Sequence, residues 1–121
     1  MRILIFSIFL SIVSCSKNNC GELSFDKNKK ITYLNGRLYS GDCESFFYTG
    51  QLKSEESYKN GVRHGVEKWY DISGKLERVF PHKNGEIHGL CKGYYESGEL
   101  RYEHPYVNGE AHGVYKYYYK Y

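Results

Sequence analysis

The chain has 121 residues, which is enough for one small domain. It contains 14 tyrosines, 13 glycines and two prolines, and its formal net charge at pH 7 is +3. Basic residues alternate with acidic ones instead of clustering, so the charge gives no nucleic-acid-binding footprint. Aromatic residues suit a pleated sheet, and the long runs at a 3.6-residue period that a helix bundle requires are missing.

The N-terminal segment has the features of an export signal. Arg2 and the free amine give it a short positive start, and residues 3–13 are apolar except for Ser7 and Ser11. This run is too short to span a membrane, which takes about 20 apolar residues. Its length and flanks are those of a signal peptide.

The end of this run, Ile12-Val13-Ser14-Cys15, resembles the lipobox of bacterial lipoproteins, with an aliphatic residue three before the cysteine and a small residue immediately before it. The resemblance implies a signal peptide over residues 1–14 and a lipid on the sulfur of Cys15, which replaces the removed segment as membrane anchor. It implies a lipid-anchored location in a bacterial cell envelope, at the outer membrane or the periplasmic face. The alternatives are an ordinary secretory signal or an uncleaved anchor, with Cys15 incidental.

Residues 15–32 contain few apolar side chains and are predicted to form a tether between the membrane and the domain. Lipidation would leave three cysteines in an oxidising environment. The candidate disulfide is Cys20–Cys43, since both residues precede the regular repeats, and Cys91 is expected to be a small buried residue in a strand. No cysteine has the paired spacing of a zinc site, so no metal or cofactor is expected.

A repeat with a period of 24 residues organises the remainder of the chain, residues 33–121. The sequence Asn60-Gly61-Val62-Arg63-His64-Gly65 recurs in similar form at residues 84–89 and 108–113, and a weaker copy without the histidine begins at Asn35. A second signal, a glycine two residues before a leucine, keeps the same period at Gly50, Gly74 and Gly98. A fixed period in the twenties indicates a repeat array.

Each repeat is predicted to be two short strands and two turns. Asn-Gly is a strong hairpin signal because both residues tolerate positive φ, and a glycine in the tighter turn takes the left-handed conformation. We expect strands over residues 66–70, 90–95 and 114–119, and return strands that begin at Leu52, Leu76 and Leu100. The residues expected to shape the turns are Asn60, Gly61, His64, Gly65, Gly74, Asn84, Gly85, His88, Gly89, Gly98, Asn108, Gly109, His112 and Gly113.

The motif Tyr-x-Asn-Gly-x-x-His-Gly, followed by an aromatic pair, Ser-Gly-x-Leu and a return to Tyr-x-Asn-Gly, resembles the MORN repeat in its bacterial variant. The resemblance covers residues 33–121, about three and a half units, although His82 stands where other units have Tyr58 and Tyr106. It implies an all-β fold, an elongated antiparallel β-hairpin ladder that serves as a scaffold or binding surface. Bacterial members are often labelled antitoxin-like.

The histidines of the loops invite a metal-binding interpretation. His64, His88 and His112 occupy equivalent positions of successive hairpins, which lie about 9–10 Å apart, two strand spacings. Zinc requires nitrogens at about 2.0–2.1 Å from one ion. We therefore expect turn histidines that bond to the backbone of their own loop.

The non-repeated polar residues contain no evident catalytic set, and the glycines pace turns instead of opening a phosphate-binding helix. These polar residues are Asp42, Glu44, Glu55, Glu56, His82 and His104. An envelope enzyme is therefore the least favoured of three hypotheses, and the sequence predicts a protein that is not an enzyme.

The tyrosines are the best functional candidates. Tyr115, Tyr117, Tyr119 and Tyr121 alternate along the last predicted strand and share one face. Aromatic rows stack on sugars or hold peptides, and tyrosine is favoured in protein interfaces; the alternative is that these rings only pack the sheet. The sequence thus predicts a non-catalytic envelope lipoprotein that binds a protein or cell-wall glycan partner. An immunity or antitoxin-like protein that neutralises a toxin is the alternative function.

Two glycines test the register of the predicted unit. Gly98 closes a tight turn that requires positive φ, whereas Gly93 aligns with Trp69 and Tyr117 in the neighbouring units. The backbone at Gly93 is therefore expected to tolerate a side chain. We expect Gly98→Val to destabilise the domain more than Gly93→Val does.

Overall fold

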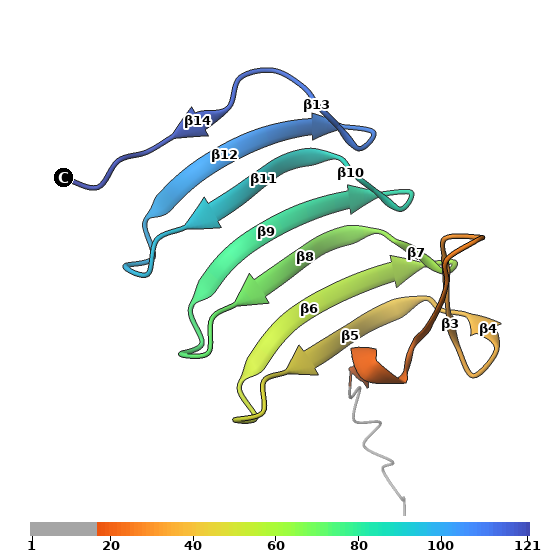
Figure 1. Ribbon diagram of the computed structural model, residues 1–121. Helices are drawn as coiled ribbons and strands as arrows, with labels where there is room; N and C mark the ends of the chain where they lie inside the picture. The colour runs from red at the N-terminus through yellow and green to blue at the C-terminus, as the bar shows by residue number, and fades with distance from the viewer. Residues whose placement is uncertain (1–16) are drawn as a thin grey trace, which may run out of the picture.

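The repeats form one sheet of antiparallel hairpins in this computed structural model, which describes residues 17–121. Each unit has a first strand of six residues and a return strand of eight. The first strands are β5 (Gly41–Phe46), β8 (Gly65–Tyr70) and β11 (Gly89–Tyr94), and the return strands are β6 (Leu52–Lys59), β9 (Leu76–Lys83) and β12 (Leu100–Val107). They lie side by side in chain order (Figure 1), so the prediction of an all-β hairpin ladder is confirmed.

The Asn-Gly loops join one unit to the next. In the first of them Asn60 has φ 50° and Gly61 has φ 82°, and the Asn-Gly pairs at 35–36, 84–85 and 108–109 also have positive φ at both residues. Three short strands beyond the repeat loops fold back on the return strands: β7 (Val62–Arg63), β10 (Glu86–Ile87) and β13 (Glu110–Ala111). The chain thereby steps sideways by one hairpin in each repeat.

The segment before the repeats is structured, and the prediction of a tether over residues 15–32 is wrong for residues 18–32. It contains β1 (Asn18–Asn19), the 3₁₀ turn η1 (Cys20–Glu22), β2 (Ser24–Asp26), β3 (Ile31–Leu34) and β4 (Arg37–Leu38). β1 pairs with β5 in parallel, and β2, β3 and β4 form a separate antiparallel sheet. Residues 1–14 and Cys15 lie outside the described residues.

The last predicted strand is shorter than expected. Residues 114–119 were expected to pair throughout, whereas β14 comprises only Lys116–Tyr117. Both residues pair with β12, through Glu103 and Tyr102, and the backbone N–H of Tyr118 donates to the carbonyl of Arg101 at 2.8 Å. A first strand gains its full length only where a return strand covers its outer edge, and no described strand does so for β14.

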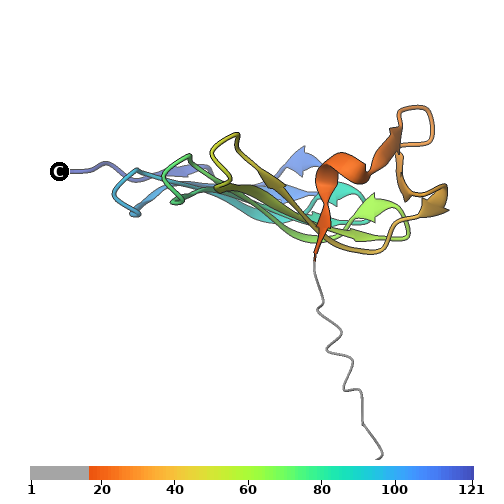
Figure 2. The same cartoon turned by 90° about the horizontal axis from the view of Figure 1, so that it is seen from below.

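The large sheet is a single curved layer, with the N-terminal sheet over one end of its concave face (Figure 2). Tyr39, Cys43 and Cys91 are the buried hydrophobic residues among those described. The buried polar residues are Thr32, Ser54, Glu56 and Glu67. The concave face is therefore partly polar at its centre. No helix within residues 17–121 is long and apolar enough to cross a membrane.

Candidate functional site

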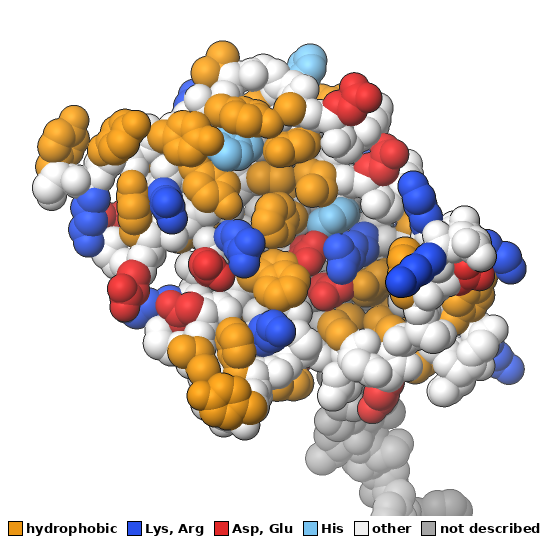
Figure 3. All heavy atoms as spheres, viewed as in Figure 1, with side chains coloured by type: hydrophobic (Ala, Val, Ile, Leu, Met, Phe, Trp, Pro, Cys, Tyr) orange, Lys and Arg blue, Asp and Glu red, His pale blue; other side chains and the backbone are white. Residues whose placement is uncertain are grey.

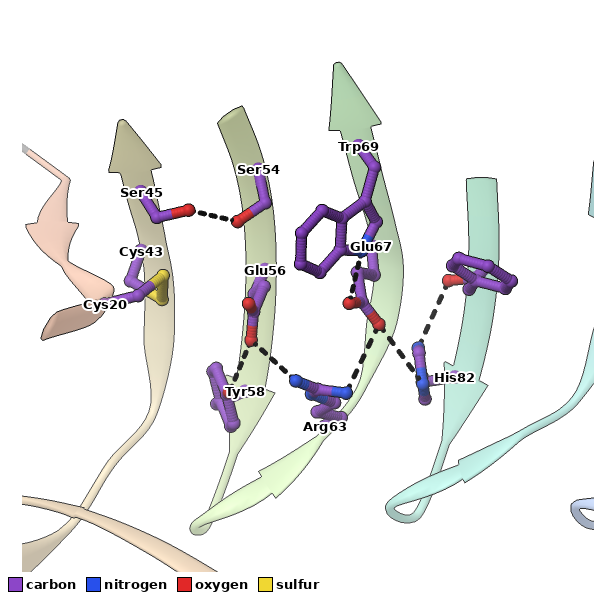
Figure 4. Close-up of polar contacts among 11 residues, drawn as sticks. Cys20, Cys43, Ser45, Ser54, Glu56, Tyr58, Arg63, Glu67, Trp69 and His82 are labelled. Atoms are coloured by element: carbon purple, nitrogen blue, oxygen red, sulfur yellow. Dashed lines mark hydrogen bonds and ion pairs between the residues drawn. A yellow bond between two sulfur atoms is a disulfide. The ribbon is translucent and has the colours of Figure 1, made fainter. Parts of the chain in front are cut away.

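Four charged or titratable side chains from adjacent hairpins meet at the centre of the concave face (Figure 4). We call Glu56, Arg63, Glu67 and His82 the ionic cluster. The Arg63 guanidinium links the two carboxylates, with Nη2 at 3.1 Å from Oε2 of Glu56 and Nη1 at 3.4 Å from Oε2 of Glu67. Nε2 of His82 lies 3.5 Å from that same Glu67 oxygen.

Neighbouring side chains complete the hydrogen bonds of the two carboxylates. The Tyr58 hydroxyl donates to Oε2 of Glu56 at 2.6 Å, and Trp69 Nε1 donates to Oε1 of Glu67 at 2.7 Å. Burial of the two carboxylates is therefore offset by charged and neutral donors, as buried charges require. Both carboxylates are held in place by side chains of the sheet itself.

Burial sets the protonation behaviour of the ionic cluster. The side chains of Glu67 and His82 are each 7% exposed. Burial lowers the pKa of His82 below its ordinary value of 6.5, with the nearby Arg63 acting in the same direction and Glu67 opposing. Burial and the hydrogen bond to Glu56 raise the pKa of Tyr58 to about 12. His82 is therefore neutral at pH 7. Its Nδ1–H donates a hydrogen bond to the carbonyl oxygen of Phe80, with Nδ1 and the oxygen 3.1 Å apart.

Sequence reasoning did not bring the ionic cluster together, although a signal for it exists in the repeat. Its members occupy positions where other units have apolar or aromatic residues: Glu56 aligns with Phe80, and Glu67 aligns with Cys91. These polar residues depart from the repeat pattern, and the register of the strands places them side by side. This combination is the sequence signal for the cluster.

Hydrophobic side chains gather over the C-terminal part of the same face (Figure 3). Five rings are in mutual contact there, and we call them the aromatic patch: Tyr102, His104, Tyr106, Tyr115 and Tyr117. The His104 ring lies between two tyrosines, with centroids 4.6 Å from Tyr102 and 4.1 Å from Tyr115, both in stacked geometry. Tyr115 remains 40% exposed and Tyr117 57% exposed. The patch therefore presents part of its aromatic surface to solvent.

The structure brings only two of the four candidate tyrosines into this patch. Tyr115 and Tyr117 contact His104, whereas Tyr119 and Tyr121 lie beyond β14 and are largely exposed. Tyr118 points to the opposite, convex face and donates its hydroxyl to Glu103 at 2.9 Å. The single row of four tyrosines is thus reduced to a pair, because regular strand geometry ends at Tyr117.

Gly93 has a packing role that its position in the repeat did not suggest. It pairs with Tyr102 across β11 and β12, and a Cβ atom at Gly93 would overlap the Tyr102 ring. The expectation that this backbone tolerates a side chain is therefore wrong. Gly98 has φ +89° and open space around it.

The loop histidines were expected to bond to the backbone of their own loops, and the ring of His88 does not. Nδ1 of His88 accepts from the backbone N–H of Asn108 at 3.2 Å, which ties it to the next loop of the ladder instead of its own. The backbone N–H groups of His64 and His112 donate to the carbonyls of Ser57 and Pro105, each at 2.9 Å.

The cysteines lie at the N-terminal end of the ladder and within it. Cys20 and Cys43 form a disulfide, with their Cα atoms 5.1 Å apart, which fastens η1 to β5. Together with Glu56 they are the one metal-ligand grouping found among the described residues, but both sulfurs are already bonded. Cys91 is a free thiol, and burial raises its pKa to about 11, so it is a poor ligand at neutral pH.

An open pocket of about 660 Å³ lies where the N-terminal sheet overhangs the concave face. Phe25, Lys30 and Thr32 line one wall, and Tyr58 and Arg63 line the other. The pocket thus adjoins the ionic cluster, so that the concave face combines a hollow, a charged centre and an aromatic patch.

Comparisons with known proteins agree with the periodicity of the sheet. A family model described as the MORN repeat variant matches residues 39–60, 63–84 and 87–108. Each matched segment ends at the asparagine of an Asn-Gly loop. No curated protein and no solved structure shows a significant match to the chain.

Proposed function

The chain belongs to the MORN repeat variant family, and on this basis we propose that it is a non-catalytic binding protein of a bacterial cell envelope. A lipid on Cys15 anchors it to the membrane, and the concave face of its ladder binds a protein or glycan partner. The general role, a repeat-based binding module, is that of the family. The lipid anchor, the location and the binding face are the parts that we propose for this chain.

The observation that best supports the binding face is the exposed part of the aromatic patch. Tyrosines that serve only to pack a sheet lose most of their exposure, whereas Tyr115 and Tyr117 retain 40% and 57% of theirs. Partly exposed tyrosines favour interfaces because each ring offers a large apolar surface and a hydroxyl at little cost in conformational entropy. Stacking on His104 holds the ring of Tyr115 in a fixed orientation.

The ionic cluster supports a binding role over a catalytic one. A general acid or base must reach a substrate with a free proton or lone pair. Here Oε2 of Glu56 already accepts from Tyr58 and Arg63, and Glu67 accepts from Trp69 and contacts Arg63. These carboxylates are engaged in holding neighbouring strands together.

Partner capture tests the binding face. The lipidated chain, used as bait in detergent-solubilised envelope, is compared with Tyr115→Ala/Tyr117→Ala and with the matched control Tyr119→Ala/Tyr121→Ala. We expect a partner that is captured by the wild type and the control, and reduced about tenfold or more with the first pair, because tyrosine is enriched among the hot-spot residues whose truncation costs about 2 kcal/mol or more. Equal capture by all three forms would contradict the proposed face.

Fatty-acid labelling tests the anchor separately. We expect labelled fatty acid to enter the wild-type protein and not the Cys15→Ala variant, because the lipobox-like segment places Cys15 at the modification position. Cys91→Ala is the control for loss of a thiol, since this buried cysteine is outside the signal. Labelling of Cys15→Ala at the wild-type level would end the lipoprotein interpretation.

A further inference from the structure

A disulfide and a carboxylate meet at the N-terminal end of the concave face. Cys43 and Glu56 are direct cross-strand partners on β5 and β6, and η1 brings Cys20 to them from outside the large sheet. One potential ligand atom from each of the three residues lies within 4.8 Å of the other two. Figure 4 shows the two sulfurs beside the Glu56 carboxylate. The fold therefore collects two potential thiolates and one carboxylate at a single point.

This set of donors suits a zinc ion once the disulfide is reduced. Zinc binds thiolate sulfur at about 2.3 Å and carboxylate oxygen at about 2.0–2.2 Å, so the ligand atoms around one ion lie about 3.5–3.8 Å apart. Donors that already lie within 4.8 Å of one another reach this spacing by small movements of their side chains. Thiolates also select zinc over magnesium and calcium, which prefer oxygen ligands.

The Glu56 carboxylate is held in place by hydrogen bonds from outside the donor set. Its Oε2 accepts from the hydroxyl of Tyr58 at 2.6 Å and from Nη2 of Arg63 at 3.1 Å, and no donor among the described residues bonds to its Oε1. Such outer hydrogen bonds orient the ligands of metal sites. Two thiolates and Zn²⁺ together have the same total charge as a disulfide, so metal binding leaves the charge balance of Glu56 with Arg63 unchanged.

The pocket beneath the N-terminal sheet gives solutes access to this point. Cys20, Glu56, Tyr58 and Arg63 are all in its lining. Cys20 is half-buried, whereas Cys43 is completely buried. A reductant therefore reaches the sulfur of Cys20 first, and water in the open pocket is available as a fourth zinc ligand. Donor set, outer hydrogen bonds and entry path are the features by which a metal site is recognised.

We propose that Cys20, Cys43 and Glu56 form a redox-controlled zinc site, which is a disulfide in one state and a metal centre in the other. A dithiol reductant attacks Cys20, the protein S–S bond breaks through a mixed disulfide, and the second thiol of the reductant resolves it. The reductant is oxidised to a disulfide, and two electrons and two protons pass to the protein as two thiols. Zinc then displaces the two thiol protons, with Glu56 as the third ligand.

This inference goes beyond the proposed function, and it depends on neither the lipid anchor nor the aromatic patch. Metal titration tests it in the full chain with Cys15→Ala and Cys91→Ala, where Cys20 and Cys43 are the only cysteines left. The chain is reduced with dithiothreitol, freed of reductant without air, and titrated with Co²⁺ and then with Zn²⁺ against a chelator. We expect one ion for each reduced chain, with the absorption of tetrahedral thiolate-bound Co²⁺, and no such absorption from the oxidised chain.

Two carboxylate variants in the same background show whether the folded site binds the ion. Glu56→Gln should weaken zinc binding about tenfold or more, because loss of even an outer hydrogen-bond partner costs about 10–100-fold in metal affinity. The matched control is Glu67→Gln, which changes the other buried carboxylate bound by Arg63 and should keep the affinity of the background chain. Equal zinc affinities of the two variants, which two thiols in an unfolded segment would also give, would overturn the inference. Absence of binding by the reduced chain would overturn it as well.

Discussion

At the scale of single residues, the role of Gly93 is to leave room for an aromatic ring on the face of the sheet. Gly93 and Tyr102 are direct cross-strand partners, and the Tyr102 ring occupies the space above the glycine while it stacks on His104. An aromatic ring over a strand glycine protects backbone that lacks a side chain of its own. Because Gly93 has no side chain, the Tyr102 ring of β12 has room to join the aromatic patch.

Because of this packing, we expect Gly93→Val to destabilise the fold more than Gly98→Val does. The repeat pattern alone predicts the opposite order. Gly98→Val places a side chain at positive φ in open space, at a cost of about 1–2 kcal/mol. Gly93→Val must move the Tyr102 ring, which costs about 1–3 kcal/mol for overpacking and about 0.5–1.5 kcal/mol for the lost aromatic pair. We expect Gly93→Val to have the lower denaturant midpoint.

A double variant provides the control for that comparison. Tyr102→Ala removes the ring that collides with the new side chain, so it should make Gly93→Val less costly than it is in the wild-type background. The same background should leave the cost of Gly98→Val nearly unchanged, since no atom lies within 4 Å of a Cβ there. Equal costs of Gly93→Val in both backgrounds would show that the ring is not the cause.

At the scale of elements, the sequence predicts those parts of the fold that local chemistry determines. Asn-Gly turns, glycine-closed hairpins and the leucine starts of return strands depend on φ preferences and short-range periodicity, and they were located within one or two residues. β14 was predicted too long because its length depends on a neighbour outside its own segment. The N-terminal strands were missed for a related reason.

The N-terminal strands depend on distant partners that composition does not reveal. β1 has two residues and pairs with β5 more than twenty residues away, as Asn18 with Cys43. Lys17 reinforces this contact by lying 3.0 Å from Glu44 and 2.7 Å from Glu55, two carboxylates that face each other in register. From composition alone, this lysine-rich segment is therefore predicted to be a linker. Its pairing becomes evident only when the register of the sheet is known. The ionic cluster escaped prediction for the same reason, since its members are separated by up to 26 residues.

At the scale of the whole molecule, a single curved sheet has little core. Three hydrophobic residues are buried among those described, and two buried carboxylates lie at the centre of the concave face. Units of a repeat ladder contact only their neighbours, so global stability depends on each interface between hairpins. The ionic cluster links residues of β6, β7, β8 and β9, and it therefore spans the interface between the first two hairpins and the strand pair inside the second.

The position of His82 in this cluster predicts how the stability of the molecule varies with pH. Burial lowers the pKa of His82 in the folded protein, whereas the unfolded chain has the ordinary value of 6.5. Below that value the unfolded chain binds a proton that the folded chain resists, so acidification favours unfolding. We expect the free energy of unfolding to fall by up to about 1.4 kcal/mol between about pH 7.5 and 5.5 on account of this group.

The variant His82→Tyr should remove this part of the pH dependence, because tyrosine stands at the equivalent positions Tyr58 and Tyr106 and does not titrate in this range. His112→Tyr, in an exposed loop, is the matched control and should keep the wild-type slope. Denaturant unfolding at several pH values gives the slopes, and hydrogen exchange should show β6, β8 and β9 losing protection together on acidification. A wild-type protein that gains stability on acidification would instead mean that attraction between protonated His82 and Glu67 outweighs the cost of burying the charge.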